Sequence, residues 1–138
     1  SWAAAGGGGG SHQTQIATSI TNINTSSIAY VDIPDMSVTM TTGANPVLIF
    51  FDASLVLSGT AGQWYQVAIV VDGAVKCAHL YESDGNGREA PYSIHWMETL
   101  TAGLHTIKAQ WKVSSAPPTV YHWGSQDRIR KLTVIELK

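Results

Sequence analysis

The stretch Tyr92–Val113 reads YSIHWMETLTAGLHTIKAQWKV. Apolar and polar residues alternate along both halves, a period of two that is typical of β-strands with one buried face. Between the halves, Thr101–Gly103 is a short loop with a glycine, which predicts a hairpin turn. A lone hairpin is marginal in water, so we expect a second sheet to cover it. The apolar faces carry Ile94, Trp96 and Leu100 in the first half and His105, Ile107, Ala109, Trp111 and Val113 in the second.

The remaining segments repeat this alternation, and apolar residues nowhere recur with helical spacing. Asp72 and Gly73 lie between two apolar runs, which is a strong signal for a two-residue hairpin turn. Pro34 is expected to end an early strand. The predicted fold class is therefore all-β, an antiparallel β-sandwich of eight to ten strands. Besides the two halves above, the expected strands cover 28–33, 36–41, 47–57, 63–71, 74–81 and 129–137.

The composition is poor in charge. Charged residues make up 13% of the 138 residues, about half the usual share of about 25%, and the net charge is −2. Two explanations fit together: an extracellular surface rich in Thr, Ser and Asn, or a surface buried between copies of the chain. Arg128 and Arg130 share a face of the last strand, and we expect that face to be solvated rather than to bind nucleic acid. No apolar run reaches the roughly 18 residues that span a membrane.

The single cysteine, Cys77, excludes an intrachain disulfide. Because it lies in an apolar strand, we expect a small buried hydrophobic residue, with an intermolecular bridge as the alternative. The chain starts at Ser1 without a methionine or a signal peptide, so we expect the C-terminal part of a longer protein or a processed product.

The N-terminal part differs from the rest in composition, and we divide the chain into an arm, residues 1–24, and a head domain, residues 25–138. Five consecutive glycines are normally a flexible linker, of an expression tag for example. We expect instead that they let neighbouring chains pack closely around a shared axis. The segment His12–Ile23 reads as an extended arm or a first edge strand. The glycines are Gly6, Gly7, Gly8, Gly9 and Gly10.

The strand that starts at Val47 opens with five apolar residues in a row. A strand that is apolar on both sides is buried on both sides, either under a loop or at a subunit interface. We therefore predict a homo-oligomer, with the glycines and this strand near the shared axis or interface. The interface residues predicted on this strand are Val47, Ile49, Phe50 and Phe51.

Two motifs carry a resemblance to a known family. The run LTAGLHTIKAQW at Leu100–Trp111 and the closing run RKLTVIEL at Arg130–Leu137 resemble the head domains at the tips of bacteriophage tail fibres and related virion appendages. The resemblance covers about Thr25–Lys138. It implies a β-jelly roll, similar in shape to complement-type and tumour-necrosis-factor-type heads and usually trimeric. That family has no fixed catalytic motif, so no site residue is transferred from it.

Candidate chemistry lies in the loops. The segment Glu82–Glu89 has oxygen ligands separated by glycines, but it lacks the spacing of an EF-hand, and we interpret it as turn chemistry rather than a calcium site. His95 and His105 flank the predicted hairpin, where we expect a hydrogen-bonded pair rather than a metal site. No nucleophile with a partnered base is recognisable. We therefore predict no enzyme activity, no metal and no cofactor.

The aromatic cluster Tyr121–Trp123 suits a sugar face or a protein partner, with a trimer interface or a core plug as the alternative. The predicted function is a structural and host-recognition module, the extracellular C-terminal head of a phage tail fibre or similar virion appendage, which binds a host glycan or protein. The alternative is a repeating subunit of an extracellular filament or pilus-like fibre, in which the arm adds a strand to its neighbour. The candidate binding residues are Glu82, Asp84, Asn86, Arg88, Tyr121, His122 and Trp123.

Overall fold

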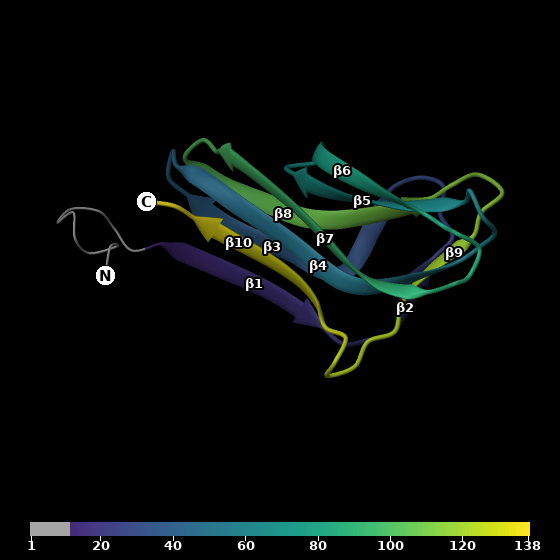
Figure 1. Ribbon diagram of the computed structural model, residues 1–138. Coiled ribbons are helices and arrows are strands. Elements are labelled where there is room, and N and C mark those ends of the chain that lie inside the picture. The colour runs from purple at the N-terminus through teal and green to yellow at the C-terminus, as the bar shows by residue number, and fades with distance from the viewer. Residues whose placement is uncertain (1–11) are drawn as a thin grey trace.

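The computed structural model describes residues 12–138, which form ten β-strands and no helix (Figure 1). These residues accordingly include no helix that could span a membrane. The all-β prediction is confirmed, and the number of strands lies within the predicted range. The strands are β1 (Gln13–Ser19), β2 (Ile23–Thr25), β3 (Val31–Thr42), β4 (Pro46–Ser58), β5 (Trp64–Val71), β6 (Ala74–Glu82), β7 (Glu89–Thr99), β8 (Gly103–Val113), β9 (Thr119–His122) and β10 (Arg130–Glu136).

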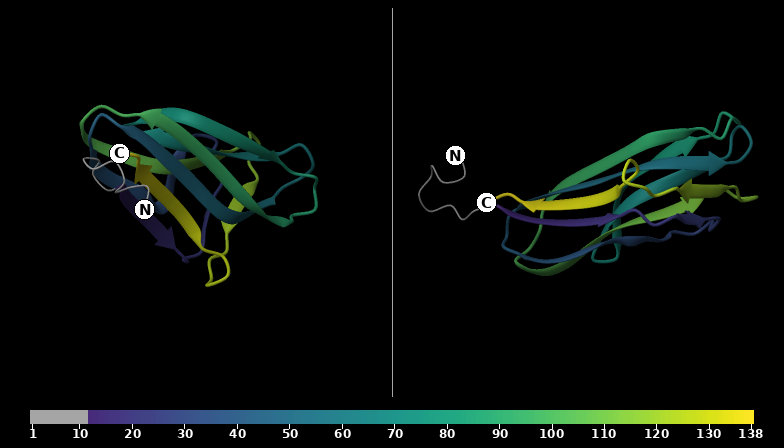
Figure 2. Two further views of the ribbon diagram at one scale, coloured as in Figure 1. Left: turned by 60° about the vertical axis from the view of Figure 1, so that its left-hand side comes forward. Right: turned by 90° about the horizontal axis from the view of Figure 1, so that it is seen from below.

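The strands form two antiparallel sheets that face each other as a jelly-roll sandwich (Figures 1 and 2). The first sheet has the order β1-β10-β4-β7, and β9 pairs with β4 beyond the end of β10 and carries β2 at its outer side. The second has the order β3-β8-β5-β6. The core between them is apolar, and its largest fully buried side chains include Trp111, Tyr65 and Phe51.

The stretch Tyr92–Val113 is not a hairpin. Its first half, β7, pairs with β4 in the first sheet, whereas its second half, β8, pairs with β3 and β5 in the second. The predicted faces are correct, because Ile94 and Trp111 both point into the core. An arch between two sheets and a hairpin within one sheet bury the same alternate residues, so the period of two cannot distinguish them.

The Asp72–Gly73 turn is confirmed as a hairpin. Val71 pairs with Ala74, and the φ angles of Asp72 and Gly73 are 51° and 82°, as a two-residue turn with both central residues left-handed requires. Pro34, by contrast, does not end a strand. It lies within β3, whose register shifts between Asp32 and Ser37, so that the irregularity absorbs the proline.

The side chains of the apolar run of β4 alternate between the core and the outer face of the first sheet. Most of the interface predicted on this strand is therefore wrong. Val47, Ile49 and Phe51 are fully buried between the two sheets of their own sandwich, so they cannot contact another chain. Leu48 and Phe50 point to the outer face of the first sheet and are half-buried. Of the four residues predicted on this strand, Phe50 alone is placed where another copy could reach it.

The segment His12–Ile23 forms an edge of the sandwich. Strand β1 pairs along its whole length with β10 of the same chain, and β2 pairs with β9, so both belong to the sheet rather than to a separate arm. Within one chain, β1 thus occupies the edge next to β10, and the strand exchange between chains of the filament hypothesis stays a prediction. Gly6–Gly10 lie outside the described residues, and their packing stays a prediction.

Candidate functional site

The aromatic cluster lies where the first sheet ends, at the right of Figure 1. Tyr121 and His122 are the last two residues of β9, and Trp123 follows directly. Because neighbouring side chains of a strand point to opposite faces, Tyr121 and Trp123 lie outside while His122 is buried. The Trp123 side chain is 48% exposed.

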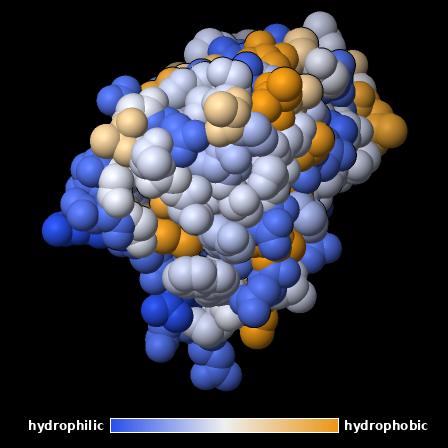
Figure 3. Space-filling view, turned by 90° about the vertical axis from the view of Figure 1, so that its right-hand side faces the viewer, coloured by the Kyte–Doolittle hydropathy of each residue, from blue (hydrophilic) through white to orange (hydrophobic). Residues whose placement is uncertain are grey.

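Tyr121 and Trp123 form one wall of a pocket of about 360 Å³. Their ring centroids lie 5.6 Å apart with an interplanar angle of 36°. Val56 and Ser58 come from the end of β4, where Val56 pairs with Tyr121, and Gly87 comes from the loop between β6 and β7. Figure 3 shows this end of the molecule, a largely pale surface of intermediate hydropathy with hydrophobic groups scattered over it. None of the five lining residues is charged.

The pocket thus brings together the segment Glu82–Glu89 and the cluster Tyr121–Trp123, but only Tyr121 and Trp123 of the seven candidate binding residues line it. In the loop after β6, only Gly87 lines the pocket. Asp84 Oδ1 accepts a hydrogen bond from the Asn86 amide at 2.9 Å, which is turn chemistry. Across residues 12–138, no three His, Cys, Asp or Glu side chains are grouped so as to hold a metal ion. The predicted residues that do not line the pocket are Glu82, Asp84, Asn86, Arg88 and His122.

A charged pair lies beside the pocket. Glu89 is the cross-strand partner of Val56 on the side opposite Tyr121. Its Oε1 accepts a hydrogen bond from Arg128 Nε at 2.9 Å, and Arg128 is nearly half exposed. The pair thus joins β7 to the loop that follows Trp123.

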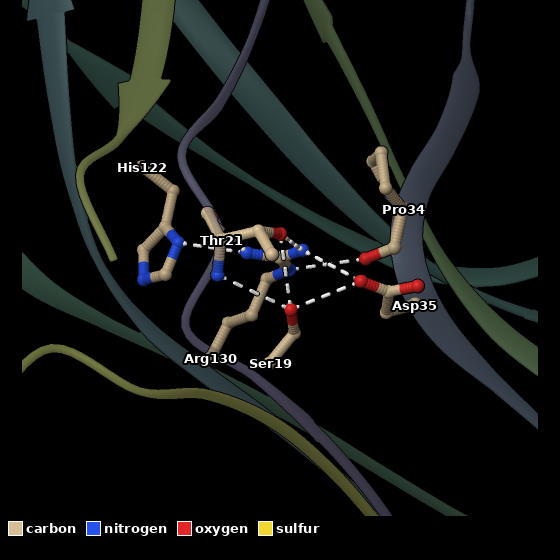
Figure 4. Close-up of polar contacts among 6 residues, drawn as sticks. All are labelled: Ser19, Thr21, Pro34, Asp35, His122 and Arg130. Atoms are coloured by element: carbon tan, nitrogen blue, oxygen red, sulfur yellow. Dashed lines mark hydrogen bonds and ion pairs between the residues drawn. The ribbon is translucent and has the colours of Figure 1, made fainter. Parts of the chain in front are cut away.

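Arg130 lies beneath the aromatic wall and corrects the expectation of a solvated arginine face. Its side chain is 0% exposed. Nη1 donates to the Thr21 carbonyl at 2.7 Å and to His122 Nδ1 at 3.0 Å, and Nη2 donates to Thr21 Oγ1 and Asp35 Oδ2 at 2.8 and 3.2 Å. Nε donates to the Pro34 carbonyl at 3.0 Å (Figure 4). All five guanidinium N–H groups are used, so this buried cation is fully hydrogen-bonded.

Two further features hold the wall. The irregularity of β3 turns the Pro34 carbonyl and Asp35 towards Arg130, and Asp35 has a φ angle of 65°. Gly124 packs against the backbone of Ile20 so closely that a Cβ atom there would lie 1.9 Å from the Ile20 carbonyl oxygen. The chain after Trp123 is thereby pressed onto the link between β1 and β2.

The predicted histidine pair does not form. His95 is exposed on β7, whereas His105 lies on β8 in the other sheet and is buried. His105 contacts Asp72 Oδ2 through Nδ1 at 2.6 Å and the Thr101 carbonyl through Nε2 at 2.7 Å. These contacts raise the pKa of His105, the Asp72 carboxylate being the larger cause. Cys77 is only half-buried, and burial raises the pKa of its thiol.

Comparison with known proteins supports the fold. No protein-family model and no curated protein matches the sequence. Among solved structures, dimeric latent PorU from Porphyromonas gingivalis is similar with a TM-score of 0.57 at 8% identity, over 91% of this chain and 12% of that chain. The CBM36-1 domain of a xylanase from the hindgut metagenome of Trinervitermes trinervoides has a TM-score of 0.47 at 14% identity, over 88% and 96% of the two chains. The sugar-binding EclA C-terminal domain has a TM-score of 0.44 at 14% identity, over 84% and 78%.

At 8% identity, the likeness to PorU shows a shared β-sandwich and nothing about ligands. This chain spans only a small part of that protein, so the activity of the whole protein is not transferred.

Proposed function

We propose that the chain is a non-enzymatic recognition module whose pocket binds an uncharged sugar. The observation that carries this proposal is the tilted pair of rings, Tyr121 and Trp123, at the wall of a pocket with an apolar residue, Val56, beside it. A sugar ring has an apolar face of C–H groups that stacks on aromatic rings, and a rim of hydroxyls. The Ser58 hydroxyl, the Tyr121 phenol and the Trp123 indole N–H supply hydrogen-bonding groups of matching polarity.

The chemistry of the lining argues for binding without catalysis. Hydrolysis of a glycosidic bond normally requires two carboxylates that flank it, and no carboxylate lines this pocket. His122, which could act as a base, points away from the pocket into the protein. A charged ligand would also find no opposite charge among the lining residues.

The test is titration with maltose, lactose and mannobiose, measured by calorimetry in wild type and variants and, in wild type, also by the NMR signal of the Trp123 indole. We expect a selective shift for at least one sugar. Trp123→Ala should weaken binding about five- to thirtyfold, because a buried ring contact is worth roughly 1–2 kcal/mol. Trp123→Phe keeps a flat ring and should retain most of the affinity, and Leu80→Ala, on the exposed edge of β6, should change nothing. If all three variants bind alike, or if no sugar shifts Trp123, the pocket is not a sugar site.

We also propose that copies of the chain associate, as a trimer according to the family resemblance, through the outer face of the first sheet near the start of β4. The register places five apolar side chains next to one another there, and Ile16 and Met97 are 56% and 57% exposed. Such a cluster is larger than the scattered apolar residues of an ordinary surface. We name it the outer apolar patch: Ile16, Leu48, Phe50, Met97 and Ile135.

Light scattering tests the assembly. We expect a mass several times that of the 14.8 kDa chain at micromolar concentration, and a single-chain mass for Phe50→Glu. Leu80→Glu adds the same charge outside the patch and should keep the assembly. A wild-type chain that is monomeric contradicts the proposal.

The position on a tail fibre or similar extracellular appendage follows from the sequence resemblance, and we retain it as a proposal. The arrangement of the chain supports it. Strand β1 begins at the left end in Figure 1, where β10 also ends, while the pocket lies at the other end beside β9. A shaft attached before β1 would leave the pocket at the tip. Antibody labelling in electron micrographs should mark discrete knobs at fibre ends, whereas labelling along whole fibres would favour the filament subunit.

A further inference from the structure

The two rings of the pocket flank a residue that can change its charge. His122 lies between Tyr121 and Trp123 in the sequence and is 0% exposed. We propose that Arg130 and neutral His122 position the aromatic wall, and that protonation of His122 in acid releases Tyr121 and Trp123 and so weakens binding. The binding part rests on the proposed function, but the movement of the wall does not.

The protonation state follows from the contact with Arg130. A guanidinium group can only donate hydrogen bonds, so His122 Nδ1, 3.0 Å from Arg130 Nη1, must accept and therefore carries no proton. A proton on Nδ1 would set N–H against N–H and place two positive charges side by side (Figure 4). Arg130 cannot yield, because its other donors are held by Thr21, Pro34 and Asp35.

The groups around His122 do not offset this conflict. Burial and the charge of Arg130 lower the pKa of His122, while the Thr21 and Arg128 carbonyls and the Glu89 carboxylate favour the charged form less strongly. Asp35 is bonded to Arg130 rather than to the imidazole, and it is more than half exposed. Charging His122 therefore requires that the contact with Arg130 break, and a free imidazolium ring is more stable in water than in this core.

The pairing of β9 transmits the change to the pocket. His122 is the last residue of β9, where it pairs with Ile23 of the short strand β2. A three-residue strand contributes few ladder hydrogen bonds, so this corner of the sheet opens more easily than its centre. If His122 turns towards solvent, alternation along the chain rotates both Tyr121 and Trp123 out of the wall.

The affinity for the sugar should fall as the pH falls. At neutral pH His122 is uncharged and the wall is formed. Each pH unit below the pKa of His122 in the folded protein reduces the neutral fraction tenfold, so the sugar dissociation constant should rise by up to about tenfold per unit there. Above about pH 6.5, the ordinary histidine value, affinity should be constant.

The experiment follows the ligand-free protein first. NMR signals of the Trp123 indole and the His122 ring are recorded from about pH 7.5 downwards, until the His122 ring has titrated. His122→Asn keeps a neutral acceptor near the Nδ1 position and removes the titration. His79→Asn, which changes an exposed histidine on β6, is the matched control. Maltose, lactose and mannobiose are then titrated at each pH, and circular dichroism verifies that the sandwich stays folded.

We expect the Trp123 and His122 signals to change with one midpoint below about pH 6.5 in wild type and in His79→Asn, and no such transition of Trp123 in His122→Asn. If the Trp123 signal does not change while His122 titrates, protonation of His122 does not release the wall. An unaltered Trp123 transition in His122→Asn would refute the proposal in the same way. If His122→Asn does not fold, the wild-type protein alone tests the proposal: the Trp123 and His122 signals must change with the same midpoint. If the wall responds to pH as expected but no sugar binds, only the proposed function is refuted. If a sugar binds with an affinity that is independent of pH, only the control of the wall by His122 is refuted.

Discussion

Glu136 provides a measurable test of how the ends of the strands are held together. It is fully buried, and its carboxylate joins three segments. Oε2 accepts hydrogen bonds from the Gly43 amide at 2.7 Å and from Asn45 Nδ2 at 2.8 Å, and Oε1 accepts one from Gln13 Nε2 at 3.0 Å. These bonds lower the pKa of Glu136, with the Asn45 bond as the first cause. The change to make is Glu136→Gln.

The expected loss can be worked out from these contacts. A glutamine keeps one acceptor oxygen, so its NH2 group must face a donor on one side. Gln13 cannot reverse its amide without cost, because Nε2 also donates to the Thr41 carbonyl. One bond to a charged acceptor, worth roughly 1.5–3 kcal/mol, is lost, and the remaining bonds lose their charge assistance, about 1 kcal/mol in all. We expect a loss of about 3 kcal/mol, or about 10 °C in Tm for a domain of this size.

The assay is thermal unfolding by circular dichroism, with the exposed Glu82→Gln as control. Because the folded pKa of Glu136 is lowered, its contribution is complete above the unfolded value of about 4.3 and disappears as the pH falls through the folded value. The Tm gap between wild type and Glu136→Gln should therefore narrow in acid. A gap near neutral pH no larger than that of Glu82→Gln, or a gap that widens in acid, would refute the reasoning.

Three further predictions concern other parts of the sandwich. His105 has an acceptor at each ring nitrogen and a raised pKa, so protonated His105 stabilises the folded protein fully below about pH 6.5, and this stabilisation is lost as the pH rises through the pKa of His105 in the folded protein. The Tm of wild type should show this decline, and the Tm of His105→Gln should not. Arg130→Lys offers three donors for five contacts and should cost about 3–5 kcal/mol in urea unfolding, whereas Arg128→Lys should cost under about 1 kcal/mol. Gly124→Ala should cost about 1–3 kcal/mol and shift the Trp123 indole signal, because the added methyl group meets the Ile20 backbone; an unchanged signal would contradict the contact.

Sequence periodicity predicted which residues face the core, but not which strands pair. Ile94 and Trp111 were assigned to buried faces correctly, because burial depends on alternation within each strand. Pairing depends on contacts between distant segments, and one short loop can turn within a sheet or cross between sheets. The Asp72–Gly73 hairpin was predictable because its turn requires particular residues at particular positions. Gly103 alone carries no comparable information about the arch.

The candidate site was also predictable only in part from the sequence. Tyr121 and Trp123 stood out as large aromatic residues near a loop, and the structure places both at the pocket. Val56 could not be recognised, since its sequence position is that of an ordinary apolar strand residue and only its cross-strand neighbour makes it part of the site. Arg130 was misinterpreted because a charged residue on a strand is normally solvated. Its five acceptors come from distant segments, and Thr21 lies more than a hundred residues from Arg130 in the sequence. No local sequence pattern therefore predicts these contacts.

Strand β4 relates the two proposed surfaces to each other. The same outer side of β4 carries Leu48 and Phe50 at its start and Val56 and Ser58 at its end. At about 3.3 Å per residue, Phe50 and Val56 lie about 20 Å apart, so an assembly over the outer apolar patch would leave the pocket open. Several pockets would then point away from a shared axis at one end of the assembly. One neutral sugar contact is weak, and its repetition on linked copies raises avidity through effective concentration. If both surfaces function as proposed, Phe50→Glu should leave the affinity for a single disaccharide unchanged and reduce binding to a sugar-coated surface, because it removes the repetition and not the site.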